Sequence, residues 1–326
     1  MKAPAFWYGP DSLQARLLAP LGQVYRAAGI LRRAVAVPYR ASVPVICIGN
    51  VVAGGAGKTP TALALAALLK KQGANPVFVS RGYGGTEAGP LRVDLESHTA
   101  QEVGDEALLL AAKAPCWIGH GRAAAVRAAE PHASHIILDD GLQNPTVAPS
   151  ISLLVIDGET ELGNGRLIPA GPLRETLEDA LRRVSAVVII GEDQQNITPR
   201  LTKPIVNASL QPRLPDGFPR QRDYFAFAGI GRPEKFYALC REAGLNIVST
   251  LDFPDHHPFS AKELNDLAEH ARVRKEKLIT TAKDWARLPA DFRTQVEVLP
   301  VELVFEDEAA LMRLIQSSTF APRLPS

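Results

Sequence analysis

A short apolar run that leads through a glycine-rich loop into a helical stretch constrains this fold more than any other feature. The run Val43 to Ile48 predicts a buried strand, and the stretch Thr59 to Lys71 predicts a helix that ends at Gly73. The loop between them is Ala53-Gly54-Gly55-Ala56-Gly57-Lys58-Thr59-Pro60. Glycines let backbone N–H groups turn toward anionic oxygens, and the helix presents the positive end of its dipole. We therefore expect a phosphate-binding loop for a nucleotide such as ATP.

The side chains at the end of this loop suit a nucleoside triphosphate. Lys58 is expected to reach the β- and γ-phosphates, and the Thr59 hydroxyl is expected to bind Mg²⁺. The usual spacing has glycine where this chain has Val52, so Gly54 and Gly55 are expected to supply the flexibility. The alternative is a glycine-rich turn that precedes Lys-Thr by chance, and the flanking strand and helix argue against it.

The alternation of strands and helices continues along the chain and predicts an α/β fold. The elements expected after the loop cover 76–80, 104–114, 120–130, 135–138, 153–157, 173–184 and 186–190. This alternation is typical of a P-loop NTPase-like, mainly parallel sheet with helices on both faces. We assign this core domain to residues 41–222, because residues 197–222 are rich in proline and polar residues and end in a boundary.

A fresh alternation follows the boundary and predicts a second, smaller α/β domain over residues 223–326, which closes over the site. Its expected elements cover 224–228, 233–243, 247–253, 261–273, 278–281 and 307–316.

Composition argues against several classes of protein. A net charge of +1 over 326 residues gives no reason to expect a nucleic-acid partner, and no obligate protein partner is evident. The three cysteines form no CxxC pair and have no metal-ligand spacing, which fits a reducing cytoplasm. The sequence has no run of about 18 apolar residues that would span a membrane.

Residues 1–40 form a basic N-terminal segment, with six Lys or Arg residues against one acid. Apolar residues recur there at spacings of mostly three or four between Ser12 and Arg33, interrupted near Pro20, and Trp7-Tyr8 precede them. This pattern is typical of an amphipathic helix that contacts a membrane surface. The alternative is an ordinary amphipathic helix packed on the core.

Another apolar strand carries two carboxylates to its end. The run Ile136 to Leu138 precedes Asp139-Asp140, and ligands collect at the carboxyl ends of strands in open α/β sheets. An aspartate there is suited to hold Mg²⁺ directly or through water. The alternative is a polar turn, which the nearby phosphate loop makes the weaker interpretation.

Several motifs, in order along the chain, resemble one family. They are Gly49-Asn50 before the glycine-rich loop, Ser80-Arg81-Gly82-Tyr83-Gly84-Gly85, Val103-Gly104-Asp105-Glu106, Asp139-Asp140-Gly141-Leu142-Gln143, the block from Gly163 to Glu175, Phe253-Pro254-Asp255-His256-His257 and Thr281-Ala282-Lys283-Asp284. This set resembles the tetraacyldisaccharide 4′-kinase family and runs from about residue 7 to residue 287. The family often has Phe and His where this chain has Leu142 and Asn144, a departure that removes no carboxylate.

The resemblance implies transfer of the ATP γ-phosphate to the 4′-hydroxyl of tetraacyldisaccharide 1-phosphate, which forms lipid IVA in lipid A biosynthesis. It also implies a lipid substrate and a peripheral or monotopic place on the cytoplasmic face of the inner membrane of a Gram-negative bacterium.

The resemblance also implies roles for individual residues. Asp105 becomes the candidate base, with His256 as its partner and His257 as the rival choice. The alternatives are an acid that stabilises a helix N-terminus and a turn before Pro258. The remaining roles are phosphate contacts for Arg122 and Arg174, Mg²⁺ and water for Glu106, Asp139 and Asp140, and substrate contacts for Asn50, Tyr83 and Arg174.

Two other functions share these motifs. A kinase for another lipid or sugar hydroxyl has the same nucleotide site, and a P-loop ATPase or GTPase switch hydrolyses its nucleotide without a phosphorylated product. The sequence has no Asn-Lys-x-Asp motif, which argues against a GTPase. An adaptor with a relic loop is disfavoured by the intact Lys58, Thr59 and Asp139.

Overall fold

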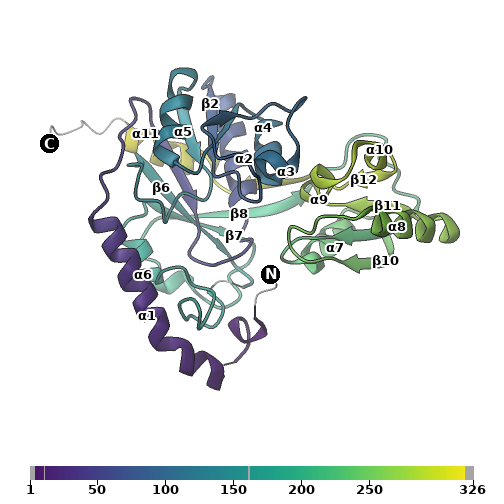
Figure 1. Ribbon diagram of the computed structural model, residues 1–326, viewed down its shortest axis with the longest axis horizontal. Coiled ribbons are helices and arrows are strands. Elements are labelled where there is room, and N and C mark those ends of the chain that lie inside the picture. Colours follow the sequence, from purple (N-terminus) through teal and green to yellow (C-terminus); the bar gives the residue numbers. More distant parts are fainter. Residues whose placement is uncertain (1–3, 11, 161, 320–326) are drawn as a thin grey trace.

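Two sheets organise the part of the chain that the computed structural model describes, residues 4–10, 12–160 and 162–319 (Figure 1). The larger sheet contains β1 Val45–Gly49, β2 Pro76–Ser80, β3 Leu91–Arg92, β4 Cys116–Ile118, β5 His135–Leu138, β6 Ile151–Asp157, β7 Ala186–Ile190, β8 Ile205–Pro212 and β13 Val301–Phe305. Its strand order is β13-β8-β7-β6-β1-β5-β2-β4-β3. Strands β8 to β4 in this order are parallel, and the edge strands β13 and β3 are antiparallel to their neighbours.

Both faces of the larger sheet are buried, as the continuous apolar runs predict. Ile46 and Ile48 of β1 pack into one buried cluster, whereas Val45 and Cys47 of the same strand pack into another. The helices on one face are α2 Lys58–Lys71, α3 Ala100–Val103, α4 Asp105–Ala111 and α11 Glu308–Thr319. The helices on the other face are α5 Arg122–Ala129 and α6 Leu177–Leu181. We call this sheet with its helices the core lobe.

The second sheet forms a small lobe to one side of the core lobe (Figure 1). Its parallel strands, in spatial order, are β10 Asn246–Asp252, β9 Asp223–Ala228, β11 Lys277–Thr280 and β12 Val296–Val298. One face packs against α7 Pro233–Glu242, and the other packs against α8 Ala261–Arg274 and α10 Ala290–Arg293. The helix α9 Ala282–Arg287 follows β11 and lies against α4 of the core lobe.

The N-terminal helix α1 Leu13–Ala34 runs along the core lobe beside α6 (Figure 1). Ser12 caps it by accepting a hydrogen bond from the Ala15 amide, and the helix continues through Pro20. Its inward stripe consists of Ala15, Gly22, Arg26 and Arg33, of which the two arginines pair with acids of the core lobe. The apolar side chains of the helix point outward instead, at Leu13, Leu17, Leu21, Val24, Ile30 and Leu31.

Some predicted boundaries differ from the structure. Residues 205–212 of the supposed boundary stretch form β8, which pairs with both β7 and β13. The range predicted for a separate second domain, 223–326, also differs, because β13 and α11 return to the core lobe. Residues 1–3 and 320–326 of the predicted terminal segments lie outside the described residues.

Three predicted helices are shorter than expected. The helix expected at 173–184 covers only α6, because Leu173 bridges to Val52 and Leu167 in extended conformation. The helix expected at 104–114 begins at Asp105 as α4, separated from α3 by Gly104. The helix expected at 120–130 is α5 followed by a short 3₁₀ turn, Glu130–His132.

Candidate active site

The glycine-rich loop joins β1 to α2 at the carboxyl edge of the larger sheet. Gly57 has a φ of 82°, and a Cβ at this position would lie 2.3 Å from the Ile190 side chain, so only glycine fits the turn into α2. The loop is anchored at its start by two backbone hydrogen bonds with the 172–174 segment: Ala53 donates to Pro172 and Arg174 donates to Val51. This loop has the position and the backbone freedom that binding of a triphosphate requires.

Two predicted ligands of the phosphate–metal centre meet beneath this loop. The Thr59 hydroxyl donates to Asp139 Oδ2 at 3.2 Å, and both side chains are buried. Burial, with the nearby carboxylates of Glu106 and Asp140, raises the pKa of Asp139 to about 7. Within the described residues, Asp139 Oδ1 is buried and has no hydrogen-bond partner. An unpaired buried oxygen beside a hydroxyl suits a hard cation.

The second aspartate of the pair is held by cations. Asp140 adopts a φ of 50°, and both its oxygens accept hydrogen bonds from Arg174 Nη1 at 3.0 and 3.1 Å. Lys58 Nζ lies 3.7 Å from Asp140 Oδ1 and 3.3 Å from the Gly54 carbonyl oxygen. Burial opposes ionisation, but Lys58 and Arg174 outweigh it and lower the pKa of Asp140. Two of the cations predicted to contact phosphate are therefore paired with one carboxylate.

Arg122, the first residue of α5, lies beside Asp139. It is 4 % exposed, and its Nη2 donates to the Asp139 carbonyl oxygen at 3.2 Å. Its Nη1 has no partner among the described residues, and burial lowers the pKa of the guanidinium. An unsatisfied buried guanidinium nitrogen is costly, so an anion near Arg122 would be stabilising.

The predicted base and its histidine meet across the two lobes. Asp105 begins α4 and is 3 % exposed, and its Oδ2 lies 3.0 Å from His256 Nδ1 of the small lobe. Gly104 allows the backbone of Tyr83 to lie close to the start of α4, because a Cβ there would lie 2.4 Å from the Tyr83 carbonyl oxygen. The rival His257 instead lies 2.9 Å from Glu263 Oε1 within the small lobe.

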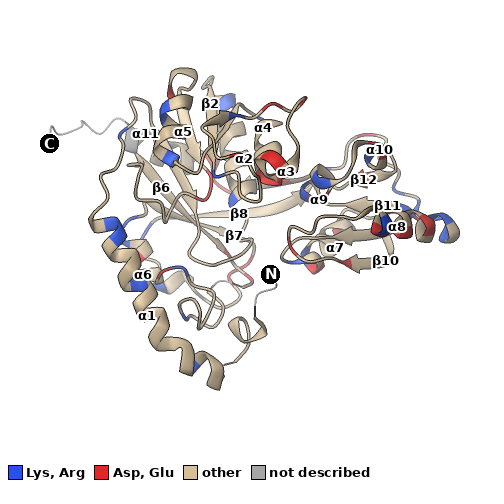
Figure 2. Cartoon of the chain, in the orientation of Figure 1, with Lys and Arg blue, Asp and Glu red and all other residues tan. Residues whose placement is uncertain are grey.

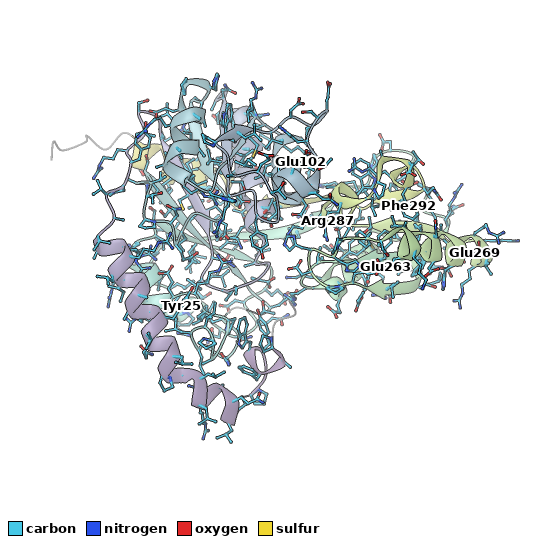
Figure 3. The ribbon with its side chains drawn as sticks, viewed as in Figure 1. Tyr25, Glu102, Glu263, Glu269, Arg287 and Phe292 are labelled. Carbon is cyan, nitrogen blue, oxygen red and sulfur yellow. The ribbon has the colours of Figure 1, made fainter. Side chains whose placement is uncertain are left out.

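The small lobe adds two cations at this point that sequence reasoning missed. Arg287 Nε lies 3.2 Å from Asp105 Oδ2, and Lys283 Nζ lies 2.8 Å from Glu106 Oε1. Burial raises the pKa of Asp105, but the hydrogen bond with His256 and the charges of Lys283 and Arg287 outweigh it, and the pKa is lowered. Figure 3 shows Arg287 where the two lobes face one another.

These two cations had only a weak signal in the sequence. Lys283 belongs to the quoted Thr281–Asp284 motif, but that motif alone assigns it no partner. Arg287 lies one turn further along α9, where its Nη2 also donates to Asp284 Oδ1 at 2.8 Å. Spacing within a helix predicts the Asp284–Arg287 pair, whereas the contact with Asp105 depends on tertiary structure.

The remaining predicted site residues lie in contrasting surroundings. Tyr83 is 63 % exposed, and its ring contacts that of His256 edge-on at a centroid distance of 5.5 Å. Asn50 is fully buried, and its Nδ2 lies 3.4 Å from the Gly54 carbonyl oxygen. Asn50 therefore supports the loop from beneath, and its contact with the substrate stays a prediction. Glu106, a predicted ligand of Mg²⁺, pairs with Lys283.

Metal ligands of protein origin are sparse here. Among the described residues, no three His, Cys, Asp or Glu side chains lie close enough together to hold a metal ion. A Mg²⁺ ion bound with a nucleotide needs few protein ligands, because phosphate oxygens and water complete its shell.

Among the helices that the structure describes, none combines the length and the apolar character that a membrane-spanning helix requires.

Comparisons with known proteins identify the family of the chain. The family model for tetraacyldisaccharide-1-P 4′-kinase matches residues 14–319. Tetraacyldisaccharide 4′-kinases of Methylobacterium radiotolerans and Rhodospirillum centenum are 49% and 48% identical, over 99% and 97% of this chain and 100% and 96% of theirs. The crystal structure of LpxK from Aquifex aeolicus in complex with ATP superimposes with a TM-score of 0.76 and 26% identity, over 94% of this chain and 100% of that one. The chain therefore belongs to the tetraacyldisaccharide-1-P 4′-kinase family.

Proposed function

We propose that this protein transfers the γ-phosphate of ATP to the 4′-hydroxyl of a tetraacyldisaccharide 1-phosphate, with the chemistry at the junction of its two lobes. The observation that carries this proposal is the proximity of Asp139, which contacts Thr59 of the phosphate loop, to Glu106, the neighbour of the buried Asp105–His256 pair. The carboxylate of Glu106, next to Asp105, raises the pKa of Asp139, so the two groups share one electrostatic environment.

The phosphate end of the reaction is handled by residues of the core lobe. Backbone N–H groups of the loop and Lys58 bind the β- and γ-phosphates, and Arg122 and Arg174 stabilise charge on the transferring group. Thr59 and Asp139 would hold Mg²⁺, which would supply neutralisation of charge on the phosphate oxygens. Arg174 is released to phosphate at the expense of its contact with Asp140, because both compete for the same guanidinium.

The acceptor end is handled by Asp105 and His256. Asp105 accepts the proton of the attacking hydroxyl, and its lowered pKa keeps it ionised at neutral pH. The Nδ1–H of His256 donates to Asp105 Oδ2, and the Glu106 amide donates to the other carboxylate oxygen. The two hydrogen bonds together fix the orientation of the carboxylate. The exposed ring of Tyr83 beside His256 is placed to contact the sugar.

The outward apolar face of α1 is suited to a lipid surface. Leu13, Leu17 and Leu21 are each more than half exposed, and basic side chains flank them (Figure 2). Leucines exposed to water gain no burial energy, whereas the interface of a bilayer stabilises them. The inward Arg26 and Arg33 already pair with acids of the core lobe. The proposed location is peripheral or monotopic, on the cytoplasmic face of the bacterial inner membrane.

One assay tests the activity. The protein is incubated with γ-labelled ATP, Mg²⁺ and tetraacyldisaccharide 1-phosphate in mixed micelles, and lipid products are separated from inorganic phosphate. Label in a lipid that carries a new 4′-phosphate is expected, and Lys58→Ala serves as the inactive control. Release of labelled phosphate without labelled lipid would instead identify an ATPase switch.

A second experiment tests the role of α1. Removal of residues 1–33 is expected to lower binding to anionic phospholipid vesicles more than binding of ATP, because the exposed leucines lie outside the phosphate loop. Vesicle sedimentation and nucleotide titration measure the two effects. Unchanged partitioning onto vesicles would exclude this role of the helix.

A further inference from the structure

A ring of four charged side chains joins the two lobes away from the Asp105–His256 pair. Asp157 ends β6 of the core lobe, and Glu159 follows it after one glycine. Arg232 directly precedes α7 of the small lobe, and Lys235 lies in the first turn of that helix. None of these four residues belongs to the phosphate loop or to the Asp105–His256 pair.

The contacts within the ring are complete, since each acid touches each base. Asp157 Oδ2 lies 3.0 Å from Arg232 Nη1 and 2.8 Å from Lys235 Nζ. Glu159 Oε2 lies 2.5 Å from Arg232 Nη2, and its Oε1 lies 3.4 Å from Lys235 Nζ. The Asp157 side chain is only 9 % exposed. Leaving a buried carboxylate without a partner costs more stability than breaking an isolated surface pair.

The two covalent connections between the lobes allow one lobe to rotate relative to the other, and this ring can fix that rotation. The chain crosses from the core lobe to the small lobe after β8 and returns just before β13. These crossings run side by side, because the Arg213 amide donates to the Pro300 carbonyl oxygen at 2.8 Å. Two adjacent crossings act as a hinge, so the angle between the lobes depends on contacts elsewhere.

The two sets of ionic contacts described here between the lobes have the same polarity. The core lobe supplies acids at each, and the small lobe supplies the cations and the histidine: Asp105 and Glu106 face His256, Lys283 and Arg287, whereas Asp157 and Glu159 face Arg232 and Lys235. Figure 2 shows the first set as the acidic start of α4 beside basic α9. Because one set contains the reacting carboxylate, the other set is free to serve as a fixed support.

We propose that Asp157, Glu159, Arg232 and Lys235 form an ion-pair lock that sets the angle between the lobes at which His256 reaches Asp105. The four side chains are positioning residues for the phosphoryl transfer. This inference rests on the proposed function for its kinetic readout, but not for its structural one.

The lock is tested with Arg232→Gln, Glu159→Gln and the double variant, in a double-mutant cycle. The matched control is Arg272→Gln, which removes the same charge from the exposed Arg272–Glu269 pair within the small lobe. Glu269 lies at the far end of that lobe in Figure 3. Spin labels are attached at Lys113→Cys in the core lobe and at Lys262→Cys in the small lobe, both of which are exposed positions. Electron paramagnetic resonance then measures the distance between the two labels.

Each single variant is expected to widen the label-to-label distance distribution and to lower kcat about tenfold, the size of one coupled contact. The KM for ATP is expected to change less than twofold, because the phosphate loop belongs to the core lobe alone. The double variant is expected to be no worse than either single variant, and Arg272→Gln is expected to match the unmodified protein. Added KCl is expected to widen the distribution of the unmodified protein more than that of the double variant, which keeps only the Asp157–Lys235 pair of the ring.

Unchanged distances in Arg232→Gln, or strictly additive effects in the double variant, would overturn the lock. Failure of the proposed function is a separate result, because it removes lipid phosphorylation from the unmodified protein and leaves the distance measurements intact.

Discussion

The two parts of the site are built in opposite ways. We call the part around the phosphate loop the phosphate corner and the part around Asp105 the base corner. At the phosphate corner, Lys58, Thr59, Asp139 and Asp140 all come from two neighbouring strand ends of one sheet. At the base corner, Asp105 comes from the core lobe, whereas His256, Lys283 and Arg287 come from the small lobe. The first corner exists whenever the core lobe is folded, and the second exists only when the lobes are correctly placed. ATP binding and phosphoryl transfer should therefore respond differently to substitutions at the two corners.

The electrostatics of the corners also differ. The carboxylic acids Asp139 and Asp105 are both buried, yet the pKa of Asp139 is raised to about 7 and that of Asp105 is lowered. Asp139 has neighbouring acids and one hydroxyl donor, whereas Asp105 contacts a histidine and an arginine. Partners decide the charge state of these two buried acids, because burial alone raises both pKa values.

The largest effect is expected from Asp105→Ala. Loss of the proton acceptor should lower kcat about 10³-fold, within the range for general-base catalysis, and leave ATP affinity almost unchanged. Steady-state kinetics and nucleotide titration measure the two quantities. Near-normal turnover in this variant would remove Asp105 from the base role.

Lys58→Ala should sharpen the contrast from the other corner. It removes charge stabilisation from the β- and γ-phosphates, so kcat should fall at least about 10²-fold and ATP affinity should fall as well. A variant that lost turnover with full ATP affinity would show that the loop lysine acts only in the transition state. Normal values for both would disconnect the loop from the reaction.

His256→Asn is expected to have a smaller effect, because the histidine acts through Asp105. A misplaced catalytic group costs up to about 10²-fold per ångström, so a fall in kcat of that order or less is expected. His257→Asn is the control, since His257 pairs with Glu263 inside the small lobe and should leave turnover within about twofold of normal. Equal losses in both variants would place both rings at the reacting hydroxyl.

The smallest effects concern stability in the presence of a chelator, and they should differ in sign. The raised pKa of Asp139 means that the folded state binds more protons than the unfolded state. The free energy of unfolding therefore falls as the pH rises through about 7. Asp139→Asn should therefore raise Tm at pH 8 by about 2 °C or more. Asp105 has a lowered pKa and stabilises the fold above its unfolded pKa, so Asp105→Asn should lower Tm at pH 8. Thermal scans at pH 5 and 8 test this, and shifts of the same sign would contradict it.

The sequence predicted the phosphate corner well because its residues are local. Eight consecutive residues of the loop lie between a recognisable strand and helix, and Asp139-Asp140 end another apolar strand. The pairing of Asp105 with His256, 151 residues later, came only from a family resemblance. Periodicity within one element carries no information on which distant element it meets.

The elements missed by sequence reasoning also have physical causes. Strand β8 begins after Pro204 and ends at Pro212, and it contains the polar residues Asn207, Ser209 and Gln211, so its sequence looks like a linker. The return of β13 to the core lobe depends on its pairing with β8, for which its own five residues give no signal. Helix α1 was recognised by its spacing, but its outward apolar face became evident only from packing against α6.

The pairing of β8 with β13 has a consequence for synthesis of the protein on the ribosome. Roughly 90 residues separate the two strands, so at about 5–20 residues per second the edge of β8 waits several seconds for its neighbour. An unpaired edge strand is a template for aggregation during that interval. Nascent chains that stall within the small lobe would therefore be the ones that depend most on chaperones.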